Sequence, residues 1–245
     1  MSLKTALKKI LGATRNSPHQ RITRASSWEE ACRLAGRYDA DLVNRFRVDR
    51  AKRAADPSLL LNNILGLAAR LIGSPDFSVT DFGGATGDLG RSLLLAYPAA
   101  KYTVVENPTL VGLMRDKIES INFTTEMPPS CDIFYTSGTL QYLDDPYGIL
   151  QKGFTSAGRL VVLVRNSFSD ADQFAAQVSP LFDNGGGPLP KGYENQMISY
   201  PHRTIMEPRV EALAKAEGFR LIARLDEYSG ALGDSYGKQL IFERT

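Results

Sequence analysis

The residues with the clearest chemical potential are the glycines and acids between Val79 and Gly90. An apolar β-type run leads there into a glycine-rich turn and then into a helical pattern, in the order VTDFGGATGDLG. Glycines in such a turn let the backbone approach a ligand without collisions from Cβ atoms. We therefore expect a ligand-binding loop at this strand-to-helix junction.

The spacing of these glycines does not match a dinucleotide loop. Such a loop needs glycine at positions i, i+2 and i+5, but counting from Gly83 the later positions hold Ala85 and Asp88. Asp88 also begins the helical pattern, where its carboxylate would repel a pyrophosphate at the positive end of the helix dipole. S-adenosylmethionine fits better, because it carries an ammonium and a sulfonium and no phosphate. Asp81 would then face the methionine ammonium.

A second acid follows at the distance expected for a ribose contact. Glu106 ends the apolar run 102–106, nineteen residues after Gly87. In nucleotide-binding α/β sheets, an acid at the end of the second strand accepts hydrogen bonds from ribose hydroxyls. The glycine-rich loop and Glu106 together indicate a cofactor site more specifically than either feature does alone. A solvated strand end for Glu106 and an ordinary strand-to-helix turn remain the alternatives.

Alternating strands and helices would position these residues. The β-rich runs and helical patterns follow each other at 77–82, 88–96, 102–106, 108–119, 131–137, 146–152 and 159–165. Such alternation predicts a mostly parallel sheet with crossover helices. Two late runs, 219–226 and 238–244, are joined by a glycine-rich loop, so we expect an antiparallel pair at the sheet edge.

The first 75 residues lack this alternation. Residues 1–24 carry six basic side chains and no acid, with apolar residues at helical spacing, and so predict a basic amphipathic arm. A terminal helix, a membrane contact and a transit peptide are the alternatives for this arm. Residues 25–75 predict a helical lead-in with a capping box at Ser27 and Glu30 and a helix over 57–72 that starts with Pro57. Residues 76–245 are the predicted ligand-binding domain.

Residues 166–200 contain several prolines and a glycine triplet and give no regular pattern. An irregular segment this long in a compact domain is usually functional or mobile. We expect an irregular cover on the substrate side, with a solvated insertion as the alternative.

Composition sets wider limits. The chain has 245 residues, of which 43% are hydrophobic and 23% charged, a composition typical of a globular protein. Its formal net charge of +2 gives no argument for a nucleic-acid partner. Cys32 and Cys131 stand apart without a CxxC motif, so we expect no metal site and two buried thiols. No apolar stretch is long enough to span a bilayer, and no signal peptide pattern opens the chain, so we expect a cytoplasmic protein.

The sequence resembles class I S-adenosylmethionine-dependent methyltransferases, and more closely the methyltransferases of surface-polysaccharide biosynthesis loci. The residues that carry this resemblance are DFGGATGDLG (81–90), VVENPTLVG (104–112), DIFYTSGTLQYLDDP (132–146) and VVLVRNSF (161–168), with NQMISYPHR (195–203) as a weaker match. The resemblance implies an α/β fold with a Rossmann-like seven-strand methyltransferase sheet, mostly parallel with an antiparallel edge pair, plus an N-terminal helical extension.

The resemblance also implies roles for matching residues. The cofactor-binding residues would be Asp81, Gly83, Gly84, Gly87, Glu106, Ser137 and Gly138. Residues 140–142, with Gln141 as an acceptor contact, match the segment where the cofactor's methyl end meets the acceptor. Many methyltransferases have glycine where this chain has Ala85, and alanine fits there if its φ is negative.

Transfer to a sugar hydroxyl needs a group that takes the hydroxyl proton. His202 is the predicted base and Tyr142 the second candidate; a satisfied histidine and an aromatic pocket wall are the alternatives. Arg165, at the end of a buried run, is predicted either to bind an anionic acceptor or to form a structural ion pair.

We thus predict methyl transfer from S-adenosylmethionine to a hydroxyl of a saccharide or glycolipid intermediate of surface-polysaccharide synthesis. The arm at residues 1–24 would contact the inner face of the membrane. A non-catalytic methyltransferase-like binding or scaffolding protein is the alternative, and a nucleotide-sugar oxidoreductase is disfavoured by the loop spacing.

Overall fold

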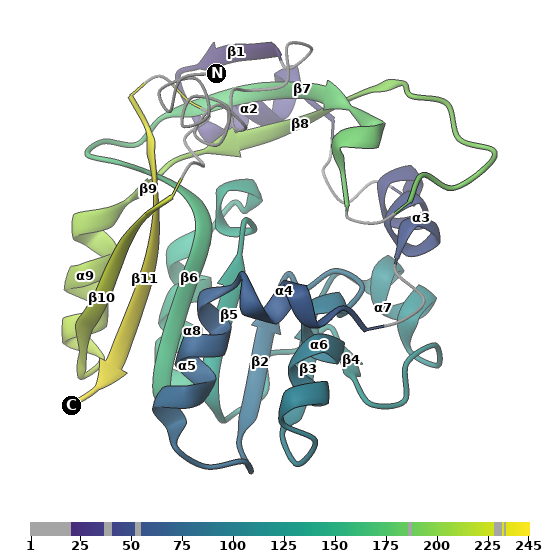
Figure 1. The fold of residues 1–245 in the computed structure, drawn as a ribbon. Coiled ribbons are helices and arrows are strands. Elements are labelled where there is room, and N and C mark those ends of the chain that lie inside the picture. The colour runs from purple at the N-terminus through teal and green to yellow at the C-terminus, as the bar shows by residue number, and fades with distance from the viewer. Residues whose placement is uncertain (1–20, 37–40, 52–54, 186–187, 228–231, 233) are drawn as a thin grey trace, which may run out of the picture.

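The computed structural model describes residues 21–36, 41–51, 55–185, 188–227, 232 and 234–245. The predicted amphipathic helix of the arm lies in residues 1–20, outside the described residues. Within the described chain, a large twisted sheet carries helices on both faces, and a smaller sheet lies across one end of it (Figure 1).

The larger sheet confirms the predicted strand arrangement. Its main strands are β2 (Ser78–Phe82), β3 (Lys101–Val105), β4 (Asn122–Thr124), β5 (Cys131–Ser137), β6 (Ala157–Ser169), β10 (Phe219–Glu227) and β11 (Tyr236–Arg244). Their order is β10-β11-β6-β5-β2-β3-β4. The five strands from β6 to β4 run parallel, and β11 is antiparallel to both β6 and β10. A short strand, β9 (Ile205–Met206), also pairs with β6.

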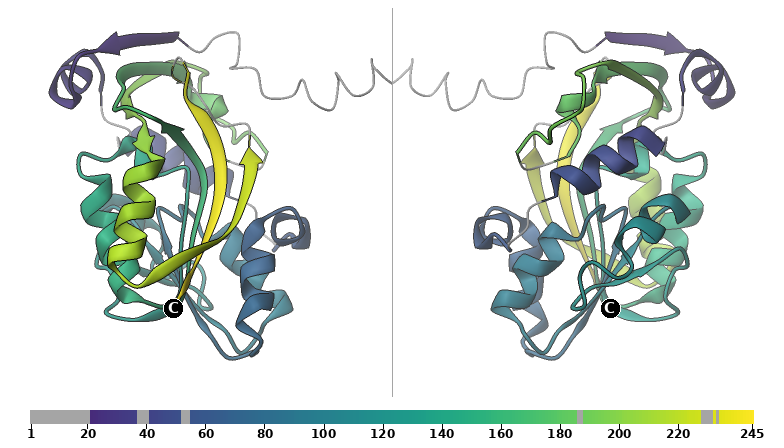
Figure 2. Two further views of the ribbon diagram at one scale, coloured as in Figure 1. Left: turned by 90° about the vertical axis from the view of Figure 1, so that its left-hand side faces the viewer. Right: turned by 90° about the vertical axis from the view of Figure 1, so that its right-hand side faces the viewer.

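Helices cover both faces of this sheet (Figure 2). One face carries α4 (Pro57–Leu61), α5 (Ile64–Ile72), α6 (Asp88–Ala96) and α7 (Pro108–Met114), and the other carries α8 (Pro146–Ser156) and α9 (Glu207–Ala216). The first face buries Leu65 and Leu93 in one hydrophobic cluster, and the second buries Leu150 and Phe154 in another. Removing these apolar side chains from water is the main stabilisation of the fold.

The helical lead-in is more divided than predicted. α2 (Trp28–Leu34) begins at Ser27, whose Oγ accepts the N–H of Glu30 at 3.2 Å, in keeping with the predicted cap. The helix predicted over 57–72 is instead the pair α4 and α5, because Asn63 Oδ1 accepts the N–H of Leu65 at 2.9 Å and starts a new helix. None of the helices in the described ranges is long and apolar enough to cross a membrane.

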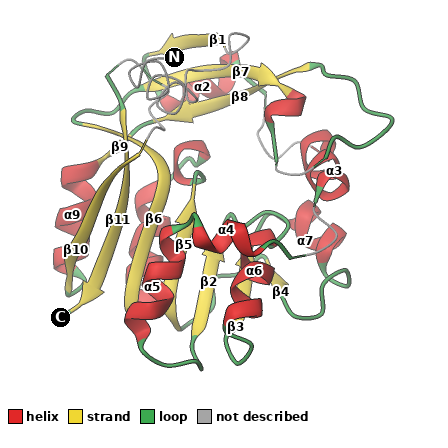
Figure 3. Ribbon diagram, in the orientation of Figure 1, coloured by secondary structure: helices red, strands yellow, loops and turns green. Residues whose placement is uncertain are grey.

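A smaller antiparallel sheet lies over the carboxyl ends of the parallel strands (Figure 3). It consists of β1 (Arg21–Ala25), β7 (Phe174–Pro180) and β8 (Met197–Arg203), in the order β1-β7-β8 within the described chain, and α2 packs against it. We call this sheet together with α2 the cap.

The cap corrects two predictions. Residues 166–200 are not irregular, since they include the end of β6, all of β7 and most of β8. Pro201 hides β8 from a sequence pattern, but proline is tolerated there because β8 is an edge strand. Residues 21–24 of the predicted arm belong to β1.

Gly90 allows α6 to pack closely on β3. A Cβ at Gly90 would lie 2.5 Å from Tyr102 Cδ1 and 2.8 Å from Ile121 Cδ1. Gly90→Ala should therefore lower the free energy of unfolding by about 1–3 kcal/mol, measured by urea denaturation. Gly112→Ala on α7 is the matched control, because no described atom apart from those of its chain neighbours and of its own helix backbone lies within 4 Å of its Cβ position. This alanine should raise stability by up to about 1 kcal/mol, and equal losses from both substitutions would contradict the close packing.

Candidate active site

The glycine-rich turn joins β2 to α6 at the carboxyl end of the main sheet. Gly83 has φ +77°, and a Cβ there would lie 2.1 Å from Thr139 Oγ1. A Cβ on Gly84 would lie 2.4 Å from Asp81 Oδ2. Gly87, with φ +71°, is the N-cap of α6. The turn therefore needs small residues for packing as well as for its left-handed backbone.

Asp81 lies buried beneath this turn, with 3% of its surface exposed. Its Oδ2 accepts a hydrogen bond from the Tyr102 hydroxyl at 2.7 Å. Burial, with a smaller contribution from the charge of Glu106, raises the pKa of Asp81 to about 7, although the hydrogen bond from Tyr102 acts to lower it. A cation placed beside Asp81 would favour its ionised form.

The Glu106 carboxylate connects three segments. Its Oε1 accepts the N–H of Ala85 at 3.2 Å, and its Oε2 accepts the N–H and Nδ2 of Asn107 at 2.9 and 3.0 Å. The Asn107 side chain in turn pairs with that of Asn44 on α3 (Asp41–Arg50), at 3.2 and 3.3 Å. The acid predicted to contact ribose thus also holds the loop and α3 in place.

Ala85 has φ +49°. Alanine was expected to fit this position if its φ were negative, and the observed φ is positive. The left-handed conformation costs a non-glycine residue about 1–2 kcal/mol. The hydrogen bond from its N–H to Glu106 helps to hold the turn in this conformation.

A cleft of about 1260 Å³ separates the main sheet from the cap. On the side of the main sheet it is lined by Asp81, Gly83, Glu106, Ser137, Gly138 and Arg165. On the opposite side it is lined by Trp28, Cys32, Ala35, Gly36 and Pro201, which belong to the cap or follow α2. Ligands of open α/β sheets bind at this carboxyl edge.

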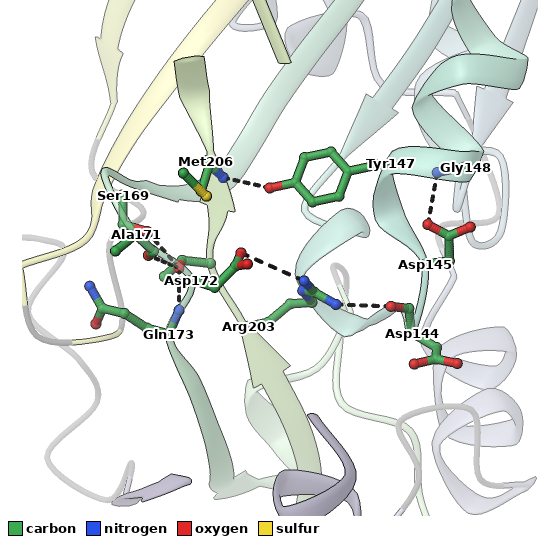
Figure 4. A network of polar contacts seen from close by, with 11 residues as sticks. Asp144, Asp145, Tyr147, Gly148, Ser169, Ala171, Asp172, Gln173, Arg203 and Met206 are labelled. Carbon is green, nitrogen blue, oxygen red and sulfur yellow. Dashed lines mark hydrogen bonds and ion pairs between the residues drawn. The ribbon is translucent and has the colours of Figure 1, made fainter. Parts of the chain in front are cut away.

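The cap is attached to the main domain through Arg203 (Figure 4). Arg203 Nη1 donates to the carbonyl oxygen of Asp144 at 2.9 Å, and Nη2 lies 3.7 Å from Asp172 Oδ1. Its guanidinium also lies over the rings of Trp28 and Phe174, at 5.7 and 5.1 Å from their centroids. Only 8% of Arg203 is exposed, and its hydrogen bond to Asp144 joins β8 to the segment that follows β5.

Neither a protein-family model nor a curated protein matches this sequence. Solved structures do match. The 1,6-didemethyltoxoflavin-N1-methyltransferase of Burkholderia thailandensis, with bound 1,6-didemethyltoxoflavin and S-adenosylhomocysteine, is 16% identical with a TM-score of 0.55, over 95% of this chain and 98% of that chain. The magnesium protoporphyrin IX methyltransferase of Synechocystis PCC 6803, with bound S-adenosylhomocysteine, is 15% identical with a TM-score of 0.54, over 88% of this chain and 99% of that chain.

A third match is an S-adenosylmethionine-dependent methyltransferase from Clostridium acetobutylicum ATCC 824. It is 12% identical with a TM-score of 0.51, over 78% of this chain and 92% of that chain. This chain has the Rossmann-like methyltransferase fold. The fold class predicted from the sequence is thereby confirmed.

Within this methyltransferase fold, the two predicted proton acceptors lie in different surroundings. Tyr142 lines the cleft and packs edge-on against Tyr200 and His202, with ring centroids 5.4 and 5.5 Å apart. His202 is 1% exposed, lies outside the lining of the cleft, and has its Nε2 3.5 Å from Ser167 Oγ. Burial lowers the pKa of His202 to about 3. The geometry therefore does not support His202 as a base that reaches an acceptor in the cleft.

The other predicted ligand contacts lie at the end of β5, directly after β5, and within β6. Ser137 and Gly138 line the cleft, and the N–H of Gly138 donates to the carbonyl oxygen of Val164 at 2.8 Å. Gln141, on the 3-10 turn η1 (Leu140–Tyr142), is buried outside the lining, where its Nε2 donates to the Arg165 carbonyl oxygen at 3.3 Å. Gln141 thus contacts the backbone of Arg165 rather than the cleft, whereas Arg165 itself lines the cleft.

Several lining residues were not predicted. The lead-in contributes Trp28, Cys32 and Asn63, whose positions depend on tertiary packing that no local pattern reports. Cys32 is exposed, contrary to expectation, whereas Cys131 is buried as expected. Asn107 had a usable signal, because an asparagine before a proline marks a helix start. The described residues contain no group of three or more side chains suited to hold a metal ion.

Asp81→Asn should show the energetic cost of the buried acid. The unfolded chain loses this proton near the ordinary pKa of 3.8, and the folded chain keeps it until about pH 7. Stability from this group is thus complete at low pH and is lost as the pH rises through 7. The variant should be more stable than the parent by up to about 4 kcal/mol at about pH 8, and by less than half of that at about pH 5, in urea unfolding without ligand.

The control is Asp116→Asn, which removes an exposed carboxyl. It should shift stability little at either pH. A pH-independent effect of Asp81→Asn would contradict the raised pKa.

Ala85→Gly should relieve the left-handed backbone of the loop. The gain of about 1–2 kcal/mol is partly offset by the greater freedom of glycine in the unfolded chain, so stability should rise by about 0.5–1 kcal/mol in urea unfolding. Ala99→Gly, at an exposed alanine that is not among the positive-φ residues, should instead lower it. A loss of stability in Ala85→Gly would show that the turn has another conformation.

Proposed function

We propose that this protein transfers a methyl group from S-adenosylmethionine to a small-molecule acceptor bound in the cleft. The observation that carries the proposal is the pairing of the Glu106 carboxylate with the Ala85 N–H of the glycine turn, beside the buried acid Asp81. A loop flanked by acids suits a cationic ligand and disfavours a pyrophosphate. The matched structures from Burkholderia thailandensis and Synechocystis hold S-adenosylhomocysteine, which supports the same cofactor here.

When bound, S-adenosylmethionine supplies an electrophilic methyl group on its sulfonium, which an acceptor atom attacks in line with the departing sulfur. Asp81 would bind the methionine ammonium, and Glu106 would accept hydrogen bonds from the ribose hydroxyls. Holding the two reactants in line can contribute about 7–11 kcal/mol toward lowering the barrier. The rigid turn and the anchored cap would provide this positioning.

The volume of the cleft leaves room for an acceptor beside the cofactor. At about 1260 Å³ it exceeds the roughly 300–1,000 Å³ typical of a pocket for one small ligand. Trp28, Leu143, Ile149 and Pro201 give it an apolar wall. Among the two predicted proton acceptors, Tyr142 is the one that lines the cleft, and we assign it an acceptor contact, with His202 positioning its ring from behind.

We infer that the acceptor is a saccharide or glycolipid intermediate of surface-polysaccharide synthesis. This inference rests on the sequence resemblance alone, and the apolar wall is compatible with it. An anionic membrane as the contact of residues 1–24 is part of the same proposal.

Calorimetry with S-adenosylhomocysteine tests the cofactor site. The parent protein should bind it, and Glu106→Ala should weaken binding by about 5- to 150-fold, because ribose hydroxyls lose a charged acceptor and the loop loses its tie to Ala85. Glu119→Ala removes an exposed acid outside the cleft and should leave the affinity unchanged.

Absence of binding to the parent at millimolar ligand would refute the proposed function. Unchanged binding in Glu106→Ala would instead refute the role assigned to this acid alone.

A further inference from the structure

Arg165 has an unusual backbone just after the last residue of β6 that pairs with β5. Its φ is +57°, and among the described residues it shares a positive φ outside glycine with Ala85 alone. The pairing of β6 with β11 moves there from Leu163–Leu240 to Asn166–Lys238, so two residues of β6 oppose one of β11. Such a bulge redirects a side chain, and a strained residue that persists needs support from its surroundings.

Contacts from three elements hold this conformation. The N–H of Arg165 donates to Glu227 Oε2 of β10 at 2.6 Å, and Glu227 Oε1 accepts from Gln239 Nε2 of β11 at 3.2 Å. The Arg165 carbonyl oxygen accepts from Gln141 Nε2 of η1 at 3.3 Å. Gln141 and Glu227 thus form hydrogen bonds with the backbone of Arg165 and not with its guanidinium.

The Arg165 guanidinium feels the charge of Glu227 but forms no salt bridge with it. Arg165 is exposed and lines the cleft beside Ser137 and Gly138. Among the described residues, no carboxylate lies within 4.0 Å of its side-chain nitrogens. The undescribed positions contain one acid in the sequence, Asp39. A guanidinium presents a fork of N–H donors that fits the paired oxygens of a phosphate or carboxylate.

We propose that Arg165 binds an anionic group, a phosphate or a carboxylate, on the methyl acceptor. This inference rests on the proposed function and narrows its acceptor to an anionic one. The acids Asp81 and Glu106 would then serve the cationic cofactor at one part of the cleft, and Arg165 the anionic acceptor beside Ser137 and Gly138. The left-handed backbone is kept because it aims the guanidinium into the cleft.

The test measures binding of three probes by calorimetry to the full chain saturated with S-adenosylhomocysteine. Glucose 1-phosphate and glucuronate carry the two anionic groups, and glucose carries neither. At least one anion should bind about tenfold or more tightly than glucose, and Arg165→Gln should weaken that binding by about 10- to 100-fold. The better of the two anions tells a phosphate site from a carboxylate site.

Arg220→Gln is the matched control, since it removes an exposed arginine that pairs with Glu243 far along β10. It should leave binding of the anion unchanged, and Arg165→Lys should retain part of it. Both Arg165 variants should still bind S-adenosylhomocysteine, because they leave Asp81 and Glu106, the two acids assigned to the cofactor, unchanged.

A second variant separates the guanidinium from the backbone. Arg165→Gly should lose anion binding while raising the free energy of unfolding, because glycine adopts φ +57° without strain. A drop in stability with this variant would overturn the claim that strain is kept for ligand binding.

Two results would overturn the proposal outright: neither anion binding more tightly than glucose, or anion binding that Arg165→Gln leaves unchanged. Failure of the parent to bind S-adenosylhomocysteine refutes the proposed function instead, and is read from the first titration before any probe is added.

Discussion

Strands β2 and β3 end side by side, and the carboxylate that follows β3 reaches across to the turn that follows β2. Glu106 accepts from Ala85 on one side and from Asn107 on the other, and Asn107 carries the link on to Asn44 of α3. The glycine turn, the start of α7 and part of the lead-in therefore share one hydrogen-bonded junction. A charged acceptor makes stronger hydrogen bonds than a neutral one, so this junction can hold Ala85 in a conformation that alanine alone would avoid.

The same end of the sheet concentrates destabilising features. Asp81 is a buried acid whose pKa has risen to about 7, and Ala85 and Arg165 have left-handed backbones. Each lowers the stability of the ligand-free protein, and all three line one cleft. Both helix-covered faces of the main sheet contain ordinary apolar packing. Such a distribution is typical of proteins in which binding residues are held in place by a well-packed framework.

The parts of the fold that local chemistry specifies could be predicted from the sequence. β5 and α6 have the predicted bounds, 131–137 and 88–96, because a β-rich run and a glycine turn mark their ends. The mostly parallel sheet followed from the alternation of strands with helices, and its antiparallel edge followed from the glycine-rich loop that joins the last two runs. β4 was missed because three residues are too short for a pattern.

Other features depend on contacts between distant residues. Gln141 and His202 were expected near the ligand, but packing against Arg165 and Tyr142 buries them. No local pattern reports burial of this kind. The backbone angle of Ala85 is likewise supported by a hydrogen bond to Glu106, 21 residues away.

The cap joins segments that are far apart along the chain. β1 pairs with β7, so that Arg21 lies opposite Val178. During synthesis at about 5–20 residues per second, roughly 8–30 s separate the appearance of these two partners from the ribosome. The strands beneath the cap from β2 to β6 are complete before β7 appears, so they can pair first. The ligand cleft would therefore acquire its second wall late in folding, after most of the surface that positions the cofactor has formed.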